Sequence, residues 1–201
     1  MDEIIIRDGR PGDAEHFAEL NFLTAPEYFE AMFGKDAKII FRKLFVLPGN
    51  IFSFQYSHFM EVNGEVAGMS LFYGYDEKNR GMVPFVIGLI KYMGLKFFIH
   101  IPDLLKTAAV FAQIKKDDLY SSSSAIYVKF RGRGLGEKLF SLAEEATRRR
   151  GLKGVVINIK ADNLAALGLR KKLGYVLDKE LPVVRMGGRD FRYLQMSKRV
   201  C

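Results

Sequence analysis

Cysteine is nearly absent from this chain: the 201 residues include one, Cys201, at the last position. A single thiol excludes an internal disulfide framework and a metal site built from cysteines, and it fits the reducing cytoplasm, where we expect the protein to reside. The three histidines are scattered without the spacing of a ligand set: His16, His58 and His100. We therefore expect no metal cofactor.

We expect neither a targeting leader nor an uninterrupted membrane span. The first residues, 1–3, are not a basic region followed by an apolar core, so we expect no secretory signal. Residues 82–101 are strongly apolar, but Lys91 and Lys96 lie inside this stretch. Each lysine would cost about 2.5–3.5 kcal/mol near a bilayer centre. We expect no transmembrane span and keep interfacial membrane contact as a minor alternative.

What the chain does have is an ordinary globular composition with an excess of positive charge. Hydrophobic residues make up 49% of the sequence and charged residues 27%, and the length predicts a single domain over residues 1–201 with a substantial core. The net charge of +8 favours an anionic partner: a polyphosphate cofactor, nucleic acid or an acidic membrane surface. Charge alone does not separate these from a surface that is basic only for solubility.

The most informative stretch is a strand, a glycine-rich loop and a helix in succession. Residues 125–130 form the apolar end of the strand, and apolar residues then recur at helical spacing over 135–146. The loop contains Gly132, Gly134 and Gly136. Such a loop binds anions, because its backbone allows close approach and the first turn of the helix presents unpaired N–H groups. Arg131 and Arg133 add guanidinium groups suited to phosphate.

The spacing within this loop excludes two nucleotide-binding motifs. A Walker loop requires Ser or Thr after its lysine, but Leu139 follows Lys138. A dinucleotide fingerprint requires a third glycine where this chain has Glu137. The remaining pattern, Arg-x-x-Gly-x-Gly over residues 131–136, resembles the acyl-coenzyme A loop of the GCN5-related N-acetyltransferase (GNAT) superfamily.

A second segment, residues 163–175, resembles another motif of the same superfamily, Asn-x-x-Ala-x-x-Leu-Tyr-x-Lys-x-Gly-Phe. The matching residues are Asn163, Ala166, Leu169, Lys172, Gly174 and the aromatic Tyr175. Two motifs stand in the correct order with an expected strand between them. The resemblance covers most of the chain outside about 76–118.

This resemblance implies the acyl-CoA N-acyltransferase fold, of class α/β (α+β). It is a single mixed, mostly antiparallel twisted sheet of six to seven strands flanked by helices. The expected strands are 3–8, 52–62, 65–73, 120–128, 153–160, 175–184 and 191–197, and the expected helices are 13–23, 27–47 with a break at Gly34, 135–150 and one following Asn163. The first strand is apolar enough to be buried on both faces.

Residues 76–118 do not fit the minimal fold. A polar loop is expected at 76–81, followed by strongly apolar stretches at 83–101 and 104–114. We expect an inserted helical hairpin packed over the sheet, either lining the acceptor pocket or forming a homodimer contact.

A run of four serines, 121–124, occupies the start of an expected central strand, although serine is a poor strand former. The hydroxyls could face the acceptor pocket. Alternatively, small side chains are tolerated where a ligand or a bulge lies close, and we favour this interpretation.

The resemblance implies that acetyl-CoA binds where the parallel strands 120–128 and 153–160 splay apart at a bulge. The implied cofactor-binding residues are Ser124, Ala125, Ile126, Val128, Arg131, Gly132, Arg133, Gly134, Leu135, Gly136, Asn163 and Arg170. A backbone N–H near Ile126 would hold the oxyanion, and the amides of 131–136 would hold the pyrophosphate. Asn163 would reach the pantetheine arm or the attacking amine.

At the catalytic positions the sequence departs from the family pattern. Arg170 replaces the tyrosine that usually serves as general acid, and Asn158 replaces a glutamate found in many members. Neither side chain is a competent proton-transfer group, although Arg170 could stabilise a thiolate or bind a phosphate. The other candidates are Tyr120, Glu61, His58 and Tyr75. Glu61 and His58 are expected on opposite faces of one strand.

We therefore expect an acetyl-CoA-dependent N-acetyltransferase that acts on a primary amine of a small molecule or protein. The alternative is a catalytically degenerate coenzyme A-binding sensor or regulatory module. A nucleic-acid-binding protein is a third hypothesis, but the chain has no recognition-helix signature, so we expect no nucleic-acid partner. The acceptor, the oligomeric state and the use of other acyl groups stay open.

Overall fold

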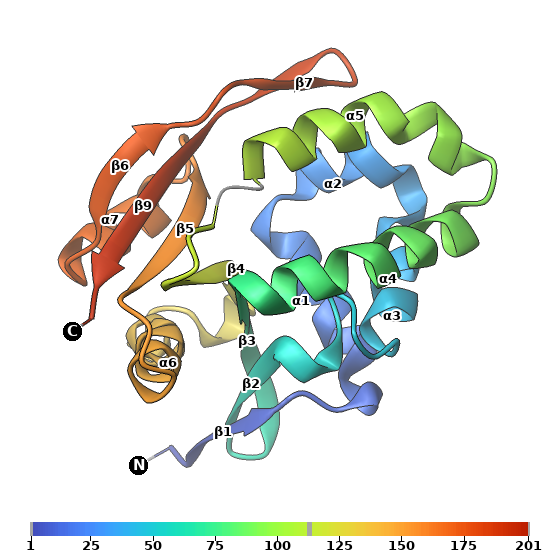
Figure 1. Ribbon diagram of the computed structural model, residues 1–201. Coiled ribbons are helices and arrows are strands. Elements are labelled where there is room, and N and C mark those ends of the chain that lie inside the picture. Colours follow the sequence, from blue (N-terminus) through green and yellow to red (C-terminus); the bar gives the residue numbers. More distant parts are fainter. Residues whose placement is uncertain (1, 112–113, 201) are drawn as a thin grey trace.

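The computed structural model describes residues 2–111 and 114–200 (Figure 1). Cys201 and the predicted helical residues 112–113 lie outside the described residues. The main strands are β1 (Ile4–Asp8), β2 (Ser57–Val62), β3 (Glu65–Gly74), β4 (Asp118–Ile126), β5 (Gly154–Lys160), β6 (Val176–Glu180) and β9 (Tyr193–Arg199). Within the described chain they form a seven-stranded sheet in the order β1-β2-β3-β4-β5-β9-β6, in which the β4–β5 pair is parallel and the other pairs are antiparallel.

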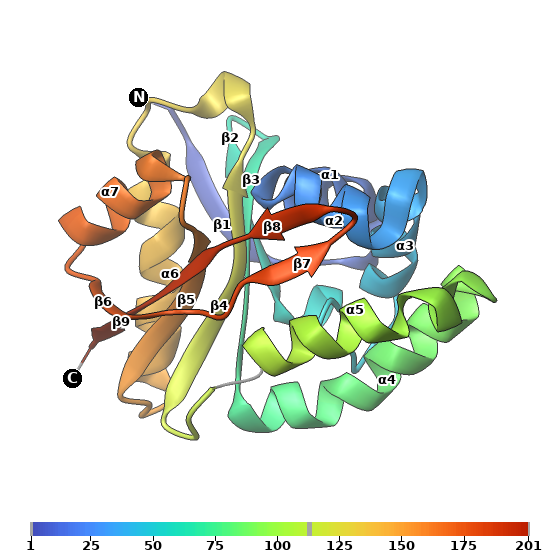
Figure 2. The same cartoon turned by 90° about the horizontal axis from the view of Figure 1, so that it is seen from above.

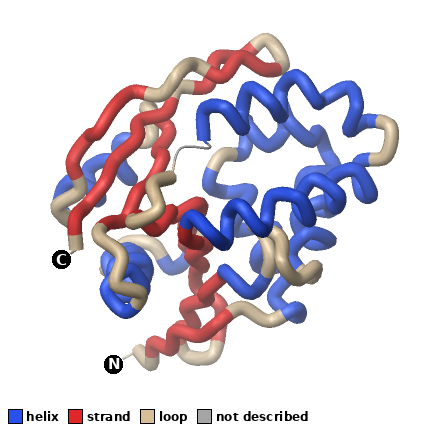
Figure 3. The backbone as a smooth tube through the Cα atoms, viewed as in Figure 1, coloured by secondary structure: helices blue, strands red, loops and turns tan. Residues whose placement is uncertain are grey.

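Helices flank this sheet, which confirms the predicted fold class (Figure 3). They are α1 (Ala14–Thr24), α2 (Pro26–Phe33), α3 (Ala37–Phe45), α4 (Tyr75–Met93), α5 (Lys96–Phe111), α6 (Leu135–Arg149) and α7 (Leu164–Lys172). A short separate hairpin consists of β7 (Val184–Met186) and β8 (Arg189–Phe191).

The sheet separates two helical layers, with α6 and α7 on one face and α1 to α3 on the other (Figure 2). Alternation along β2 explains how both faces are covered. Phe59 packs into the core beneath α1 to α3, whereas Met60 packs with Leu135 and Leu139 of α6. Both Phe59 and Met60 are completely buried. The site described below lies where these two layers meet the ends of β4 and β5.

The first strand is not buried on both faces as predicted. Ile5 and Ile6 are 43% and 38% exposed, because β1 lies at the edge of the sheet beside β2. An apolar run predicts a strand but does not predict whether that strand lies at the centre or at the edge of the sheet. Here the strand lies at the edge.

The predicted strand 52–62 begins later than expected, at Ser57. Residues Phe54–Tyr56 form a 3₁₀ turn instead. Ser53 starts this turn, since its hydroxyl accepts a hydrogen bond from the Gln55 N–H at 3.3 Å. The side chain of Asn50 supports the preceding chain by donating to the carbonyls of Leu44 and Leu47. Local side-chain bonds to the backbone therefore overrode the aromatic strand pattern.

The inserted segment is a helical hairpin, α4 and α5, as predicted. The expected polar loop at 76–81 is wrong, because these residues form the first turns of α4. The Glu77 carboxylate accepts a hydrogen bond from the Gly74 N–H at 2.5 Å and so caps the helix. The hairpin packs mainly beside α2, α3 and β7 rather than over the sheet. Along the described residues, no helix has the length and apolar character needed to cross a membrane.

The predicted strand 175–184 is divided in two. β6 ends at Glu180, and the chain leaves the main sheet at Pro182 before β7 begins at Val184. Proline cannot donate to a strand ladder, so it marks the point of departure. Gly187 and Gly188, both at positive φ, form the turn that joins β7 to β8.

Candidate functional site

The parallel strands β4 and β5 begin as a pair and then separate. Their register runs from Asp118 opposite Gly154 to Ser121 opposite Ile157, but the strands continue to Ile126 and Lys160. A bulge accompanies the separation: in the β3–β4 ladder Leu71 pairs with Ser123 and Phe72 with Ser121, which leaves Ser122 as the extra residue. The bulge lies within the serine run, as the preferred interpretation of that run predicts.

This separation leaves backbone groups of β4 directed into the opening between the strands. The Tyr127 N–H donates to the Ala67 carbonyl, on the β3 side. Because successive strand residues direct their N–H groups to opposite sides, Ile126 and Ser124 direct theirs towards β5, into the opening. The Arg131 Nε donates to the Ile126 carbonyl at 3.1 Å on that side. The opening therefore offers free main-chain donors to an extended polar ligand.

The glycine-rich loop lies at one end of this opening, where α6 begins. Gly134 is the N-cap residue of α6 with φ +72°, and no side chain bonds to the helix start. A Cβ at Gly136 would lie 3.1 Å from Leu169 of α7, so this glycine lets the two helices approach. The N-terminus of a 15-residue helix thus faces the opening with uncapped N–H groups.

The second motif places α7 beside this loop. Asn163 caps the helix, because its Oδ1 accepts from the Ala166 N–H at 3.1 Å. Lys172 binds Glu137 of α6 at 2.5 Å, which links the two motifs.

Arg170, in the position of the family tyrosine, is only 1% exposed. Its guanidinium carbon lies 3.6 Å from the ring centroid of Phe140 and 4.9 Å from that of Tyr175. Burial lowers the pKa of this guanidinium. Within the described residues, its Nη1 and Nη2 atoms have no hydrogen-bond partner. A buried cation of this kind retains capacity for an acceptor atom of a bound ligand.

One cavity, of about 900 Å³, includes both the loop and the opening between the strands. Of the predicted cofactor-binding residues, its walls include Ser124, Ala125, Ile126, Arg131, Gly132, Gly134, Leu135, Gly136, Asn163 and Arg170. Val128 and Arg133 are not among the lining residues. Val128 is 69% exposed, and Arg133 lies 3.7 Å from Asp2 in an exposed ion pair.

The structure separates the candidate catalytic residues. Tyr120 lines the cavity, where its hydroxyl accepts a hydrogen bond from Asn158 Nδ2 at 3.0 Å, and burial raises its pKa. Tyr75, Glu61 and His58 are not among the lining residues. Glu61 binds Arg7 at 2.6 Å, and His58 binds Asp8 at 2.9 Å on the opposite face of β2. In the described part of the chain, no cluster of His, Cys, Asp or Glu suited to a metal was found.

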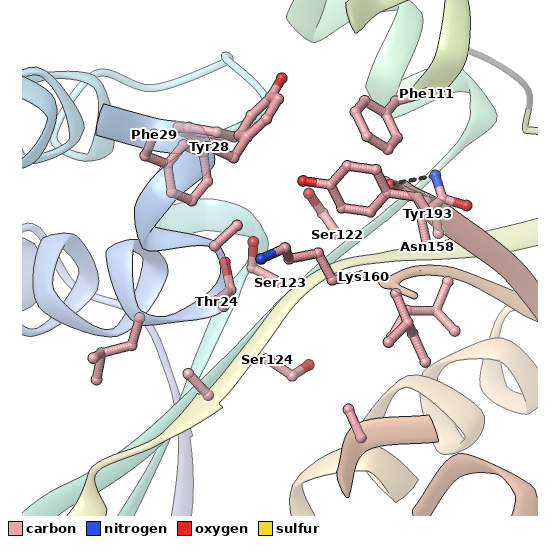
Figure 4. Close-up of a pocket in the computed structure, with 18 of the residues that line it drawn as sticks. Thr24, Tyr28, Phe29, Phe111, Ser122, Ser123, Ser124, Asn158, Lys160 and Tyr193 are labelled. Atoms are coloured by element: carbon pink, nitrogen blue, oxygen red, sulfur yellow. Dashed lines mark hydrogen bonds between the residues drawn. The ribbon is translucent and has the colours of Figure 1, made fainter. Parts of the chain in front are cut away.

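Several lining residues were missed in the sequence because no motif contains them. Figure 4 shows Thr24, Tyr28, Phe29, Phe111, Lys160 and Tyr193 around the same space as Ser122 to Ser124. Lys160 is the last residue of β5 and binds Glu27 at 2.8 Å and Asp162 at 3.2 Å. The hydrogen bond from Lys160 to Glu27 raises the pKa of the lysine. The position of Lys160 at the end of the splayed strand was the one feature of the sequence that could have indicated its place in the cavity.

Beyond the opening, on the side away from the loop, the cavity continues into a space that we call the apolar chamber. Its walls are defined by Phe29, Phe52, Met82, Phe85, Leu104 and Phe111. These residues come from α2, from the turn before β2 and from the α4–α5 hairpin. The inserted hairpin therefore lines the cavity, which is one of the two roles expected for it.

Comparisons with solved structures show the same fold. An N-acetyltransferase from Staphylococcus aureus Mu50 has a TM-score of 0.64 at 21% identity, covering 96% of this chain and 100% of that one. Ard1 from Thermoplasma volcanium has a TM-score of 0.61 at 18% identity, covering 98% of both chains. The yncA protein of Salmonella typhimurium, solved with its cofactor acetyl-CoA, has a TM-score of 0.58 at 19% identity, and the match covers 98% of this chain and 94% of that one.

Curated relatives match a shorter region. The N-alpha-acetyltransferase 30 of Schizosaccharomyces pombe is 32% identical over 76 residues, which is 37% of this chain and 51% of the relative. An L-methionine sulfoximine/L-methionine sulfone acetyltransferase of Pseudomonas aeruginosa is 33% identical over 75 residues, 36% of this chain and 42% of the relative. The chain thus spans about half the length of these relatives, or less. The model of the acetyltransferase (GNAT) family, however, matches residues 17–175, and the chain belongs to that family.

Proposed function

We propose that this protein is an N-acetyltransferase that uses acetyl-CoA and a primary amine. The observation that carries the proposal is the opening between β4 and β5, with the uncapped start of α6 at one end of the same cavity. The local identity to proteins named as acetyltransferases supports it.

The residues around the opening fit coenzyme A. The loop N–H groups and Arg131 suit a pyrophosphate, and the space over Gly134 is open, since a Cβ built there would meet nothing within 4 Å. The N–H groups of Ser124 and Ile126 suit the amides of a pantetheine arm. Arg170 adds a buried cation with unpaired nitrogens on the α7 side. When bound, acetyl-CoA supplies an acetyl group activated as a thioester.

The contribution of this chain to the reaction is then mainly positioning. The N–H of Ile126 would donate to the acyl oxygen as negative charge develops on it, and a fixed donor in a dry site stabilises that charge. The amine enters from the apolar chamber, because the loop and α6 occupy the opposite end of the cavity. Thr24, Ser122 and Ser123 lie at this entry and can accept hydrogen bonds from the amine (Figure 4).

Two measurements test the proposal. Isothermal titration should detect acetyl-CoA binding, and the absence of binding at millimolar ligand would overturn it. Thiol release from acetyl-CoA should then depend on an added amine, across a panel of alkylamines, amino acids and peptides.

Arg170 favours a second candidate, a coenzyme A-binding regulatory module. The position of the family's proton donor holds a guanidinium stacked on Phe140, a group that does not give up its proton at neutral pH. This candidate predicts coenzyme A binding without amine-dependent thiol release for any member of the panel.

A further inference from the structure

The apolar chamber indicates the class of acceptor. Its aromatic walls are held by edge-to-face ring contacts: Phe52 and Phe85 have ring centroids 5.0 Å apart, and Phe111 and Tyr193 have centroids 4.9 Å apart. Folding would usually cover such a surface, and a contiguous apolar wall left open to a cavity is typical of a binding site.

Most of the chamber's polar groups already have partners inside the protein. The Tyr28 hydroxyl donates to Thr107 Oγ1 at 2.9 Å, and Asn158 donates to Tyr120. Lys160 is held by Glu27 and Asp162. Few polar atoms in the chamber therefore require a hydrogen bond from an occupant.

Negative charge is scarce in the walls. Among the described lining residues Glu137 is the one carboxylate, and it lies on the loop side, bound to Lys172. A second ammonium group in the chamber would have no counter-charge on its walls, which disfavours polyamines and lysine-rich peptides. Lys78, at the start of α4, adds positive charge to the same walls.

We propose that the acceptor is a primary amine carrying one extended apolar group, an alkyl chain or an aryl ring, which fills the apolar chamber while the amine lies among Thr24, Ser122 and Ser123. This inference rests on the proposed function. The hydroxyls lie between the opening and the chamber, so they meet the polar end of such an amine. The same chamber could receive a long chain from the acyl donor, and the experiment separates these two sources.

The test titrates butylamine, hexylamine, octylamine, phenethylamine and spermidine into the full-length protein saturated with coenzyme A. Each methylene buried in the chamber should tighten binding roughly fourfold, from about 0.8 kcal/mol per CH₂. Octylamine and phenethylamine should bind much more tightly than butylamine, and spermidine should bind most weakly. Affinity that is independent of chain length, or strongest for spermidine, would overturn the proposal.

A matched pair of variants locates the effect. Leu105 lines the cavity and is 65% exposed, whereas Leu95, at the hairpin turn, is 84% exposed and not among the lining residues. Leu105→Gln should weaken octylamine several-fold more than butylamine, and Leu95→Gln should leave both unchanged. Both leucines are largely exposed, so neither change should impair folding, and equal effects of the two variants would count against the chamber.

The last experiment varies the chain length of the acyl donor. Thiol release is compared for acetyl-CoA and octanoyl-CoA with butylamine, and for butylamine and octylamine with acetyl-CoA. A lower KM for octylamine supports the proposal, whereas a preference for octanoyl-CoA with no discrimination among amines overturns it. Titration of coenzyme A alone reports on the proposed function separately: coenzyme A binding with a flat amine series rejects this inference only.

Discussion

The two ends of the cavity, one at the glycine-rich loop and one at the α4–α5 hairpin, are lined by different kinds of chemical group. We call them the loop end and the hairpin end. At the loop end, glycines, arginines and main-chain N–H groups meet the start of α6, and the specific features are local in sequence. At the hairpin end, side chains of α2, α4 and α5 line the cavity. They come from a stretch of 83 residues of the sequence, Phe29 to Phe111, and share only their apolar character. A site formed by backbone geometry can be recognised in the sequence by a motif. A site formed by apolar packing appears in the sequence only as apolar composition.

The largest expected effect tests the loop end through backbone geometry. Gly134 has φ +72°, and Gly188 in the β7–β8 turn has φ +73° with equally open surroundings. Valine at either position should lower the free energy of unfolding by about 1–3 kcal/mol, because it strains the backbone in the same way. Gly134→Val should reduce coenzyme A affinity at least 100-fold by titration calorimetry, and Gly188→Val should not. Equal coenzyme A affinity in the two variants would remove the loop from the site.

The pH dependence of the reaction tests which group ionises, the amine or a residue of the protein. Burial raises the pKa of both Tyr28 and Tyr73, which line the cavity, to about 12, so these phenols stay neutral between pH 6 and 9. The amine reacts as its free base. We expect kcat/KM to rise about tenfold per pH unit until the pKa of the amine itself is reached.

Amines of different pKa check this assignment. The bend in the profile should move with the amine. A bend that stays in place would assign the ionisation to the protein, and Lys78, whose pKa is lowered by burial, is then the first residue to replace.

Arg170 connects the loop end to the core, and its replacement should have an intermediate effect. Arg170→Met removes a hydrogen-bonding cation worth about 1.5–3 kcal/mol when paired, so coenzyme A affinity should fall about tenfold or more. Loss of stacking on Phe140 and relief of the buried charge oppose each other, so the midpoint of thermal unfolding should change little. An unchanged dissociation constant would show that the guanidinium has only a packing role.

The smallest effect tests how firmly the hairpin end is attached. Tyr28→Phe deletes the hydrogen bond to Thr107, which links α2 to α5, and should lower the free energy of unfolding by about 1 kcal/mol. Amide hydrogen exchange should accelerate in α5 and not in α6. Faster exchange in α6 as well would contradict the view that the two ends are separately supported.

Local signals explain most of what was predicted correctly. Asn163 caps the helix that was expected after it, and the serine run contains the bulge. The misplaced starts of β2 and α4 have one cause: Ser53 and Glu77 bond to nearby backbone, and such bonds override residue-type patterns. The edge position of β1 depends on neighbours distant in sequence and could not be read from its apolar run.

The sequence by itself determined the family, the order of the elements and the glycine-rich loop before α6, because glycine spacing and helix capping act over a few residues. Only the tertiary structure decided that Thr24, Tyr28, Lys160 and Tyr193 share one cavity, and that the inserted hairpin supplies its apolar wall. Arg133, within the loop, and Val128, just before it, are not among the residues that line the cavity. Adjacency along the chain sets backbone conformation, whereas which side chains face one cavity depends on packing between segments that the sequence keeps far apart.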